Sequence, residues 1–488
     1  MEFSKYQNDF FAQSDEIGNL QLIAVAGSGK TFSLVEFMKR IKGNSIFLAF
    51  NKSIQEELSA RVPSYVTAST LHSAGYKSIR KSTKGYIKVD NNKLSAIMQF
   101  DVAATSFQKS MSGLEKSEIF KLRKVVTDLV SMWKNTMIDF TNDSQTAEIA
   151  DHYGITFDAT QALQIAKTVM QKSIVKMSVI DFDDMIYMPV AHKFSVETYD
   201  NVFIDECQDL NRTQMELVKM IAKKPNGRII MVGDPRQSIY GFRGADTNAM
   251  ELMRDSLNAK VLPLSVCYRC PKSHIALAKE LVPYIESAPN AIEGIIETIC
   301  SSEFVNKVST ESETLVLCRT NAPLVSYAVK MIREGKKATV RGTDIGKYLK
   351  SLVIGFQTNT IDSFLEKVDE WENAQLEQLN KRMASTSVKE TICDYADVLR
   401  MFAEQCANPF DIANTIDRIF DDNTTTGTIF SSVHKAKGLE ANVVYILHPE
   451  KLPLTFKNQK DWELDQEMNL KYVALTRSKN KLVFVNEK

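Results

Sequence analysis

The segment Ala24 to Thr31 (AVAGSGKT) constrains the fold more than any other part of the sequence. It overlaps the end of an apolar run, Leu20 to Ala26, and precedes a helical pattern that reads FSLVEFMKRI. Glycines 27 and 29 let backbone N–H groups wrap around phosphates, and the helix N-terminus adds its positive dipole. Lys30 is placed to reach the β- and γ-phosphates of a nucleotide, and Thr31 to hold Mg²⁺. The sequence therefore predicts a phosphate-binding loop between a strand and a helix, with Ala24 in place of the usual first glycine.

Other apolar runs are unbroken rather than alternating, a pattern typical of parallel strands buried on both faces. In the first half they are Ser45 to Phe50, Asn201 to Ile204 and Arg228 to Val232, and in the second half Thr314 to Cys318, Thr428 to Phe430, Val443 to Leu447 and Lys481 to Val485. Helical patterns separate them. We therefore expect an α/β protein with two sets of parallel strands.

Two mainly helical segments interrupt these strand series. In the first, apolar residues recur at three- and four-residue steps between Ile119 and Trp133, so we expect a helical insertion at 81–180. The second, at 346–424, holds eight lysines and arginines against fourteen aspartates and glutamates, a net charge of −6. The expected α/β domains are then 1–80 with 181–260, and 261–345 with 425–488. The short low-complexity segment Asn423 to Thr426 is interpreted as a linker.

The composition excludes several classes of protein. Lys plus Arg (60) equals Asp plus Glu (60), so any nucleic-acid binding must come from local patches. The N-terminus has no signal-peptide pattern and no stretch reaches the roughly 18 apolar residues of a membrane span, so we expect a cytoplasmic protein without a membrane partner. Seven cysteines are an odd number, which argues against a disulfide framework. Only His274 lies near the Cys267–Cys270 pair, so a structural role is favoured there over zinc.

An acidic strand end supplies the second part of a nucleotide-hydrolysing site. In Val202 to Asp209 (VFIDECQD), Asp205 stands at the tip of an expected buried strand and can hold Mg²⁺ through water. Glu206 is placed to polarise the attacking water as general base. Gln208 and Asp209 continue into the following loop, where their positions could depend on whether the γ-phosphate is present.

Six motifs occur in the order found in superfamily 1 helicases: AGSGKT, DECQD, VGDPRQSIYGFRGAD (Val232 to Asp246), Tyr268-Arg269, VHKAKGLE (Val433 to Glu440) and YVALTRSK (Tyr472 to Lys479). The chain resembles a compact member of the UvrD/Rep family, and the acidic insertion resembles a reduced form of that family's second insertion. The resemblance implies two RecA-like domains with ATP and Mg²⁺ in the cleft between them. It also implies a translocase on single-stranded DNA, acting at single/double-strand junctions and moving 3′ to 5′.

The resemblance assigns roles around the nucleotide. Gln7 corresponds to the glutamine that reads the adenine edge, Tyr268 to the tyrosine that stacks on adenine, and Glu440 to the glutamate near the ribose. Gln237 corresponds to a residue that links the γ-phosphate to DNA, and Arg269 and Arg477 to two arginines that reach the γ-phosphate. A surface ion pair is the alternative role for each arginine. With these the expected nucleotide-binding residues are Gln7, Ala26, Gly27, Ser28, Gly29, Lys30, Thr31, Phe32, Tyr268 and Glu440. Phe32 stands where many relatives carry an arginine that packs on the base, so the stacking is expected to differ.

The resemblance also implies a DNA track on loops of both domains. Its expected residues are Phe50, Asn51, Thr70, His72, Tyr240, Phe242, Arg243, His434 and Lys435. Exposed aromatic side chains can stack on bases of any sequence, while basic and hydroxyl groups bind phosphates. Phe242 stands where relatives often carry tryptophan. Core packing is the alternative for Phe50, Tyr240 and Phe242.

Two further segments have competing interpretations. Asp181, Asp183 and Asp184 (DFDDM) could suggest a metal-dependent nuclease, but a similar segment in the family simply leads back from the first insertion. The basic stretch Arg80 to Lys88 is either a contact to duplex phosphates or a solvated loop.

The acidic insertion is a poor candidate for gripping DNA because phosphates would repel it. We hypothesise that it regulates the motor or docks a protein partner. Besides a helicase, the sequence leaves open an accessory translocase that displaces proteins with little unwinding, and a degenerate module that binds without hydrolysis. A small-molecule P-loop kinase would not need the second half with its arginines. The pathway stays open, as does the location beyond the cytoplasm: nucleoid-associated, or in an infected host cell for a phage protein.

Overall fold

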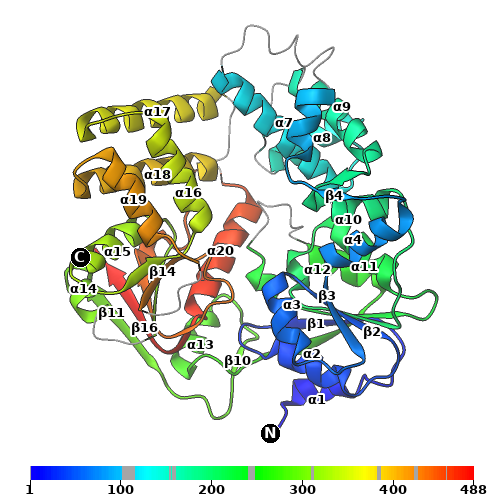
Figure 1. Cartoon of the computed structure of the whole chain (residues 1–488). Coiled ribbons are helices and arrows are strands. Elements are labelled where there is room, and N and C mark those ends of the chain that lie inside the picture. Colours follow the sequence, from blue (N-terminus) through cyan, green and yellow to red (C-terminus); the bar gives the residue numbers. More distant parts are fainter. Residues whose placement is uncertain are drawn as a thin grey trace. The chain divides into compact units, whose positions relative to one another are not determined.

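The structure is a computed structural model that describes residues 2–101, 116–152, 155, 161–239, 248–308, 313–381, 386–422, 427–457 and 459–487 (Figure 1). Contacts divide the chain into two compact units. Met1–Ala24 and Gly29–Leu264 form the first unit, and Val25–Ser28 with Ser265–Lys488 form the second. Each unit is built on a six-stranded sheet. Of the helices in the described part of the chain, none has the length and apolarity that a membrane crossing requires.

The sheet of the first unit is parallel in every described pairing, with strand order β3-β2-β6-β7-β1-β8. Its strands are β1 (Leu20–Ala24), β2 (Ser45–Ala49), β3 (Val66–Thr70), β6 (Asn201–Ile204), β7 (Arg228–Gly233) and β8 (Lys260–Leu264). Parallel strands place their carboxyl ends at one edge of a sheet, where ligand-binding loops gather. The phosphate loop leaves β1 at this edge, and the acidic segment leaves β6 there.

Both faces of this sheet are covered by helices (Figure 1). Alternate residues of β2 point to opposite faces: Ile46 and Leu48 join one buried cluster, Phe47 and Ala49 the other. Helices α1 (Lys5–Phe11), α2 (Lys30–Met38) and α3 (Lys52–Ser59) cover one face, and α4 (Leu71–Ser82), α10 (Phe182–Ala191), α11 (Arg212–Ile221) and α12 (Ala249–Leu257) cover the other. This two-sided burial explains the unbroken apolar runs in the sequence.

The helices within residues 93–175 have a hydrophobic core of their own. This first insertion contains α5 (Lys93–Ala96), η1 (Ile97–Asp101), α7 (Lys116–Thr136), α8 (Asp143–His152) and α9 (Gln161–Val175). Its core centres on Trp133, which is fully buried. The short strands β4 (Lys88–Val89) and β5 (Val179–Ile180) pair where the chain enters and leaves the insertion.

Buried ion pairs connect this insertion to α10. Lys134 of α7 contacts Asp181 and Asp184 at 2.8 Å each, and Lys93 of α5 contacts Asp184 at 2.6 Å. Asp181 and Asp184 also form the capping box at the start of α10. The side chains of Lys93, Lys134 and Asp184 are at most 1% exposed. Two positive and two negative charges therefore compensate one another inside the protein, where an unpaired charge would be costly.

The sheet of the second unit is also parallel in every described pairing, with strand order β11-β16-β15-β12-β14-β13. Its strands are β11 (Ile295–Cys300), β12 (Thr314–Cys318), β13 (Ala338–Val340), β14 (Thr428–Ser432), β15 (Ala441–Leu447) and β16 (Ser478–Asn486). Two shorter strands, β9 (Val266–Cys267) and β10 (Glu286–Ser287), pair with each other. Helices α13 (Lys272–Ala278), α14 (Ser301–Val308), α15 (Ala322–Arg333) and α20 (Asp461–Leu475) complete this part of the unit.

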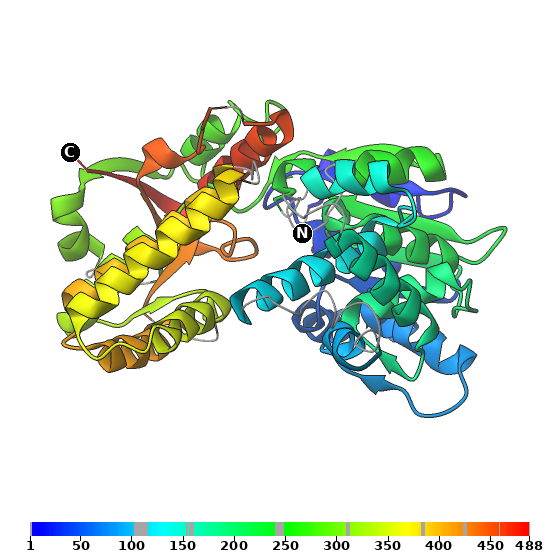
Figure 2. The ribbon, with the colours of Figure 1, turned by 90° about the horizontal axis from the view of Figure 1, so that it is seen from above.

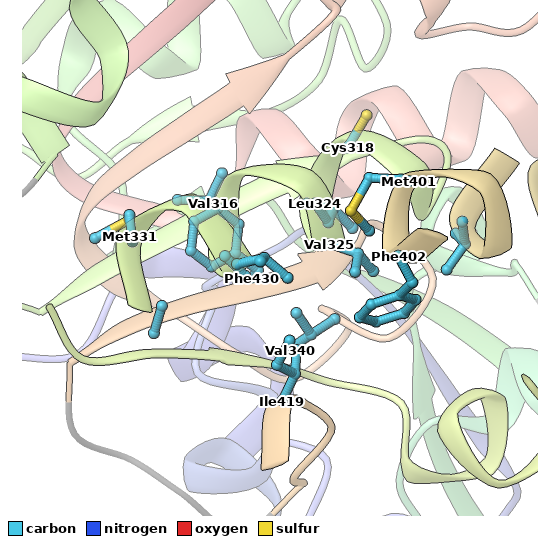
Figure 3. Packing of buried hydrophobic residues seen from close by; sticks show 14 of the residues in the cluster. Val316, Cys318, Leu324, Val325, Met331, Val340, Met401, Phe402, Ile419 and Phe430 are labelled. Carbon is cyan, nitrogen blue, oxygen red and sulfur yellow. The ribbon is translucent and has the colours of Figure 1, made fainter. Parts of the chain in front are cut away.

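The acidic insertion shares its core with this sheet. It contains α16 (Thr343–Gly355), α17 (Ile361–Lys381), α18 (Thr386–Gln405) and α19 (Pro409–Ile419), and α17 packs along α18 (Figure 2). Phe402 and Ile419 of the insertion lie in the same buried cluster as Val316, Val340 and Phe430 of the strands (Figure 3). The insertion is therefore a layer on the sheet rather than a separate lobe.

The predicted α/β fold with parallel sheets is confirmed. All the strands expected from apolar runs are present, and the expected helical periodicity between Ile119 and Trp133 lies in α7. The sequence analysis did not name β3, β8, β11 and β13, which are the edge strands of the two sheets. Edge strands carry exposed residues and break the apolar pattern, as in the burial of β11. The finer division of each unit into a motor domain and an insertion stays a prediction.

We predict that Asp184→Ala destabilises the first unit by about 3–5 kcal/mol, because two buried lysines lose a partner. The matched control is Asp128→Ala, which removes the exposed Lys124–Asp128 pair on α7 and should change stability by less than about 0.5 kcal/mol. Urea unfolding, followed by Trp133 fluorescence in a background where Trp371 and Trp462 are replaced by phenylalanine, measures both. Equal effects of the two substitutions would show that the buried network does not hold the insertion.

Candidate functional site

The phosphate loop has the backbone conformation that its glycines allow. Gly27 and Gly29 have φ of +67° and +74°, and Gly29 is the N-cap of α2. A Cβ on Gly27 would lie 2.7 Å from Arg269 Cβ and 2.9 Å from Cys267 Sγ. Glycine is therefore required at position 27 both for its left-handed backbone and for space.

Lys30, the first residue of α2, lies among three carboxylates. Its Nζ contacts Glu206 Oε1 at 2.9 Å. Burial alone would lower the pKa of Lys30, but the negative charges of Glu206, Asp205 and Asp234 outweigh burial and raise the pKa above its usual value. Lys30 is therefore fully charged and held in place at neutral pH.

Thr31 and Asp205 form the pair that the sequence predicts for Mg²⁺. Thr31 Oγ1 donates to Asp205 Oδ2 at 2.6 Å, and Asp205 Oδ1 accepts from the backbone N–H of Glu206 at 2.9 Å. Burial, with the neighbouring charge of Glu206, raises the pKa of Asp205. A hydroxyl and a carboxylate are hard oxygen donors, so these residues fit Mg²⁺, which typically takes few protein ligands when it binds nucleotide phosphates.

Glu206 stands in a strained backbone conformation and begins a hydrogen-bonded chain. Its φ is +54°, which is uncommon for a residue with a side chain. Gln208 Nε2 donates to Glu206 Oε2 at 2.6 Å, and Gln208 Oε1 accepts from the backbone N–H of Asp234 at 3.1 Å. Gln237 Nε2 donates to Asp234 Oδ2 at 2.7 Å. This series of hydrogen bonds thus links Glu206, the predicted general base, to Gln237.

The sequence analysis missed Asp234. It lies at the end of β7, is fully buried, and its pKa is raised by burial although the charge of Lys30 opposes the rise. The signal was present in the motif GDPRQ, where an acid directly follows a strand.

Gln7 and Phe32 lie beside the phosphate loop in the first unit. The side chain of Gln7 accepts from the backbone N–H of Ser4 and donates to Ser33 Oγ of α2. Its Nε2 is 4.0 Å from the position that a Cβ on Gly29 would occupy. The Phe32 ring lies 6.3 Å from the ring of Phe3, between centroids. An apolar ring therefore stands directly after the phosphate loop, at the third position of α2.

Residues 25–28 of the loop pack within the second unit. Tyr472 Oη accepts from the N–H of Ala26 at 2.9 Å, and the N–H of Tyr268 donates to the carbonyl of Gly27 at 2.8 Å. The Ser28 side chain is buried, and its Oγ has no hydrogen-bond partner among the described residues. The sequence analysis quoted Tyr472 within a motif but gave it no role.

The structure brings Arg269 and Glu440 together. Arg269 Nε contacts Glu440 Oε2 at 2.5 Å, and Lys479 Nζ contacts Glu440 Oε1 at 2.7 Å. The pKa of Glu440 is lowered because these charges outweigh its partial burial. Tyr268 is 46% exposed.

Arg477 is the more constrained of the two predicted arginines. It is 1% exposed, and its guanidinium donates to the carbonyls of Val473 and Leu439 and to Thr476 Oγ1. These bonds fix the guanidinium between α20 and the VHKAKGLE segment. A role for Arg477 at a phosphate stays a prediction.

Four of the predicted DNA residues line one groove in the first unit. Phe50, Asn51, Thr70 and His72 lie at the carboxyl ends of β2 and β3, around a hollow of about 570 Å³. Asn51 and Thr70 are also the N-caps of α3 and α4, which fixes both loops. Phe50 is 44% exposed, so the alternative of core packing is wrong for its side chain.

The same groove contains residues that the sequence analysis did not assign to DNA. Phe182 is 51% exposed and meets the His72 ring edge to face at 5.6 Å. Lys52 and Lys77 also line the groove. Phe182 belongs to the DFDDM segment, and nothing in the spacing of that segment indicates that its aromatic side chain is exposed.

The second-unit loop after β14 carries His434 and Lys435. Lys435 Nζ contacts Asp344 Oδ1 of α16 at 2.6 Å, so the base of the acidic insertion holds this lysine. Tyr240, Phe242 and Arg243, and the predicted linker Asn423 to Thr426, lie outside the described residues.

The aspartates of the DFDDM segment do not form a metal centre. Asp181 and Asp184 are neutralised by Lys134 and Lys93, and Asp183 accepts from Ser131 Oγ at 2.5 Å. Over the described parts of the chain, no cluster of three or more His, Cys, Asp or Glu side chains could hold a metal ion. Ion pairs with buried lysines therefore account for Asp181 and Asp184.

The two parallel sheets and the phosphate loop define a P-loop protein of RecA-like domains. Residues 7–258 match the UvrD/REP helicase N-terminal domain, and residues 134–488 match the UvrD-like helicase C-terminal domain. The chain therefore belongs to the UvrD/Rep helicase family.

Individual relatives agree with this family. F-box DNA helicase protein 1 of Schizosaccharomyces pombe is 24% identical over 95% of this chain, and F-box DNA helicase 1 of Gallus gallus is 23% identical over 95%. ATP-dependent DNA helicase PcrA of Bacillus subtilis is 28% identical over 54% of the chain. The matched regions span 55%, 47% and 37% of these relatives, respectively.

We predict that His72 remains neutral at pH 7, because burial lowers its pKa below the usual value of 6.5. Proton NMR of the imidazole signals, assigned with His72→Gln, gives the titration. Phe182→Ala should move the pKa of His72 upward, since it opens the ring to water. A His72 that titrates above the value of a free histidine would contradict this account of the groove.

Proposed function

We propose that this protein is an ATP-dependent DNA helicase that hydrolyses ATP and moves along single-stranded DNA. The observation that carries the proposal is the arrangement of Lys30, Thr31, Asp205 and Glu206 at the carboxyl ends of β1 and β6. Membership of the UvrD/Rep family and the names of the relatives support it.

The contact between Lys30 and Glu206 suggests how binding prepares hydrolysis. The phosphates of ATP compete for Lys30, so their binding releases Glu206 from its ion pair. Glu206, still held by Gln208, then accepts a proton from the attacking water. Mg²⁺, when bound by Thr31 and Asp205, would neutralise charge on the phosphates.

The remaining nucleotide contacts are proposed from the resemblance and the exposed groups. Gln7 would exchange its bonds to Ser4 and Ser33 for the adenine edge, and the exposed ring of Tyr268 would stack on the base. Arg269 would exchange Glu440 for the γ-phosphate, and Arg477 would contribute a second guanidinium. Gln237 is connected to Glu206 through Asp234 and Gln208. A change in the hydrogen bonds of Glu206 would therefore reach the proposed DNA-binding segment that follows Gln237 in the sequence.

DNA would lie in the groove of the first unit. Phe50 and Phe182 offer rings for stacking, while Lys52 and Lys77 attract phosphates. His72, kept neutral by burial, would act as a hydrogen-bonding ring rather than a cation. In the second unit, His434 and Lys435 are proposed to contact the phosphate backbone.

The acidic insertion is proposed to dock a protein partner. Its surface acids include Asp362, Glu366 and Glu370 of α17. Deleting residues 346–424 would not test this idea, because it would also strip Phe364, Phe402 and Ile412 from the core of the sheet. Charge-neutralising substitutions on the surface of α17 are the appropriate variants.

We predict that Lys30→Ala lowers ATP hydrolysis by about 100- to 1,000-fold, because the phosphates lose a preorganised charge. Glu206→Gln should lower turnover by about 100- to 10,000-fold through loss of the general base, while ATP still binds. Phosphate release and binding of a fluorescent ATP analogue distinguish the two variants. Lys39→Ala, at the exposed C-cap of α2, is the matched control and should hydrolyse ATP normally. Normal turnover in either site variant would refute the assignment.

We predict that the protein unwinds duplexes that carry a 3′ single-stranded tail and not matched duplexes with a 5′ tail. The physical basis is that a translocase must load on the strand along which it moves. Strand separation on both substrates with ATP, and with Lys30→Ala as the inactive control, gives the result. Unwinding from the 5′ tail would overturn the direction. DNA-stimulated hydrolysis without unwinding would instead favour an accessory translocase that displaces proteins.

A further inference from the structure

Two cysteines flank the residues that the second unit is proposed to present to the nucleotide. Cys267 ends β9 and Cys270 precedes α13, so Tyr268 and Arg269 lie between them. Both cysteine side chains are buried, at 0% and 2% exposure. They pack in one hydrophobic cluster with Val25, Ala26 and Tyr472.

A hydrogen bond connects the two cysteines across the short loop between them. The backbone N–H of Cys270 donates to Cys267 Sγ at 3.4 Å. The neighbouring Cys270 thiol, the backbone donors and the charge of Arg269 lower the pKa of Cys267 below that of an ordinary thiol despite burial. The pKa of Cys270 is raised in return. Cys267 is therefore the more acidic thiol of the two, and Cys270 keeps its proton more firmly.

The surroundings decide which chemistry this pair can perform. Among the described residues no third ligand completes a metal site. Burial keeps large reagents away, whereas a peroxide is almost as small as water. The exposed Tyr268 ring and the partly exposed Arg269 show that the loop between the cysteines reaches solvent.

We propose that Cys267 and Cys270 are a site of reversible oxidation by hydrogen peroxide or small peroxides, and that their disulfide lowers nucleotide turnover. The effect on turnover depends on the proposed function, but the oxidation itself does not.

The reaction balances in two steps. The thiolate of Cys267 attacks one peroxide oxygen, the O–O bond breaks, and the released hydroxide takes up a proton to become water, which leaves a sulfenic acid. The Cys270 sulfur then attacks the Cys267 sulfur, and the hydroxyl leaves with the Cys270 proton as a second water. Two thiols are oxidised to one disulfide, and one hydrogen peroxide is reduced to two waters, or one organic hydroperoxide to an alcohol and a water.

The disulfide would disturb the loop that it closes. Cys270 Sγ now donates to the carbonyl of Thr476 at 3.5 Å, and the disulfide removes this bond. Cys267 Sγ and Arg269 Cβ both border Gly27 so closely that no Cβ fits there. A shift of Cys267 would therefore press on Gly27 and change how Arg269 packs beside it.

The first experiment measures the oxidation directly on the full chain. The protein is treated with hydrogen peroxide, its remaining thiols are alkylated, and its peptides are examined by mass spectrometry. We expect the peptide with Cys267 and Cys270 to lack two hydrogen atoms, to resist alkylation and to recover with dithiothreitol. A bulky aromatic disulfide reagent should instead label the exposed Cys300 and leave the pair unmodified. If both cysteines are alkylated after peroxide treatment, the proposal is wrong.

The second experiment measures ATP hydrolysis before and after peroxide. We expect a loss of about tenfold or more, since a displacement of about 1 Å in a positioned group can cost about 100-fold, and full recovery with dithiothreitol. Cys270→Ser retains a donor to Thr476 and should hydrolyse ATP normally but resist inhibition, and Cys300→Ser should remain sensitive. A disulfide without any change in turnover would overturn the regulatory part. Absence of hydrolysis in the reduced protein would refute the proposed function, while the mass measurement would still decide the oxidation.

Discussion

The site depends on one lysine placed among three buried carboxylates. Lys30 contacts Glu206, and Asp205 and Asp234 lie close enough to raise its pKa. Burial raises the pKa of both aspartates as well, so one lysine does not by itself stabilise the charged forms of all three carboxylates. A cation beside Thr31 and Asp205 would relieve this imbalance. The position of Lys30 in turn depends on the sheet, because β1 and β6 bring the loop and the carboxylates to one edge.

The parts of the fold that could be predicted are those with a local signal in the sequence. The inner strands are buried on both faces, so their residues form apolar runs that identify them. Edge strands such as β11 carry exposed residues and lack this signal. The covering of the second sheet by the acidic insertion could not be predicted either, because Phe402 and Phe430 meet only after the chain has folded.

The same distinction applies to the site. Lys30, Thr31, Asp205 and Glu206 follow from motifs of fixed spacing, and the structure brings them into contact. Asp234 and Phe182 stand within recognised segments, but their importance depends on contacts between distant residues. Phe182 joins the groove because α10 packs against α4, which carries His72. No pattern along the chain contains that information.

The two insertions are attached by different kinds of interaction. The first has its own hydrophobic core and connects to α10 through paired charges, whereas the second shares its core with a sheet. This difference bears on how the architecture can evolve. A segment that closes its own core can be exchanged between related proteins, provided that the paired charges at its base are kept. A segment that completes the core of its host must instead change gradually, one compensated side chain at a time.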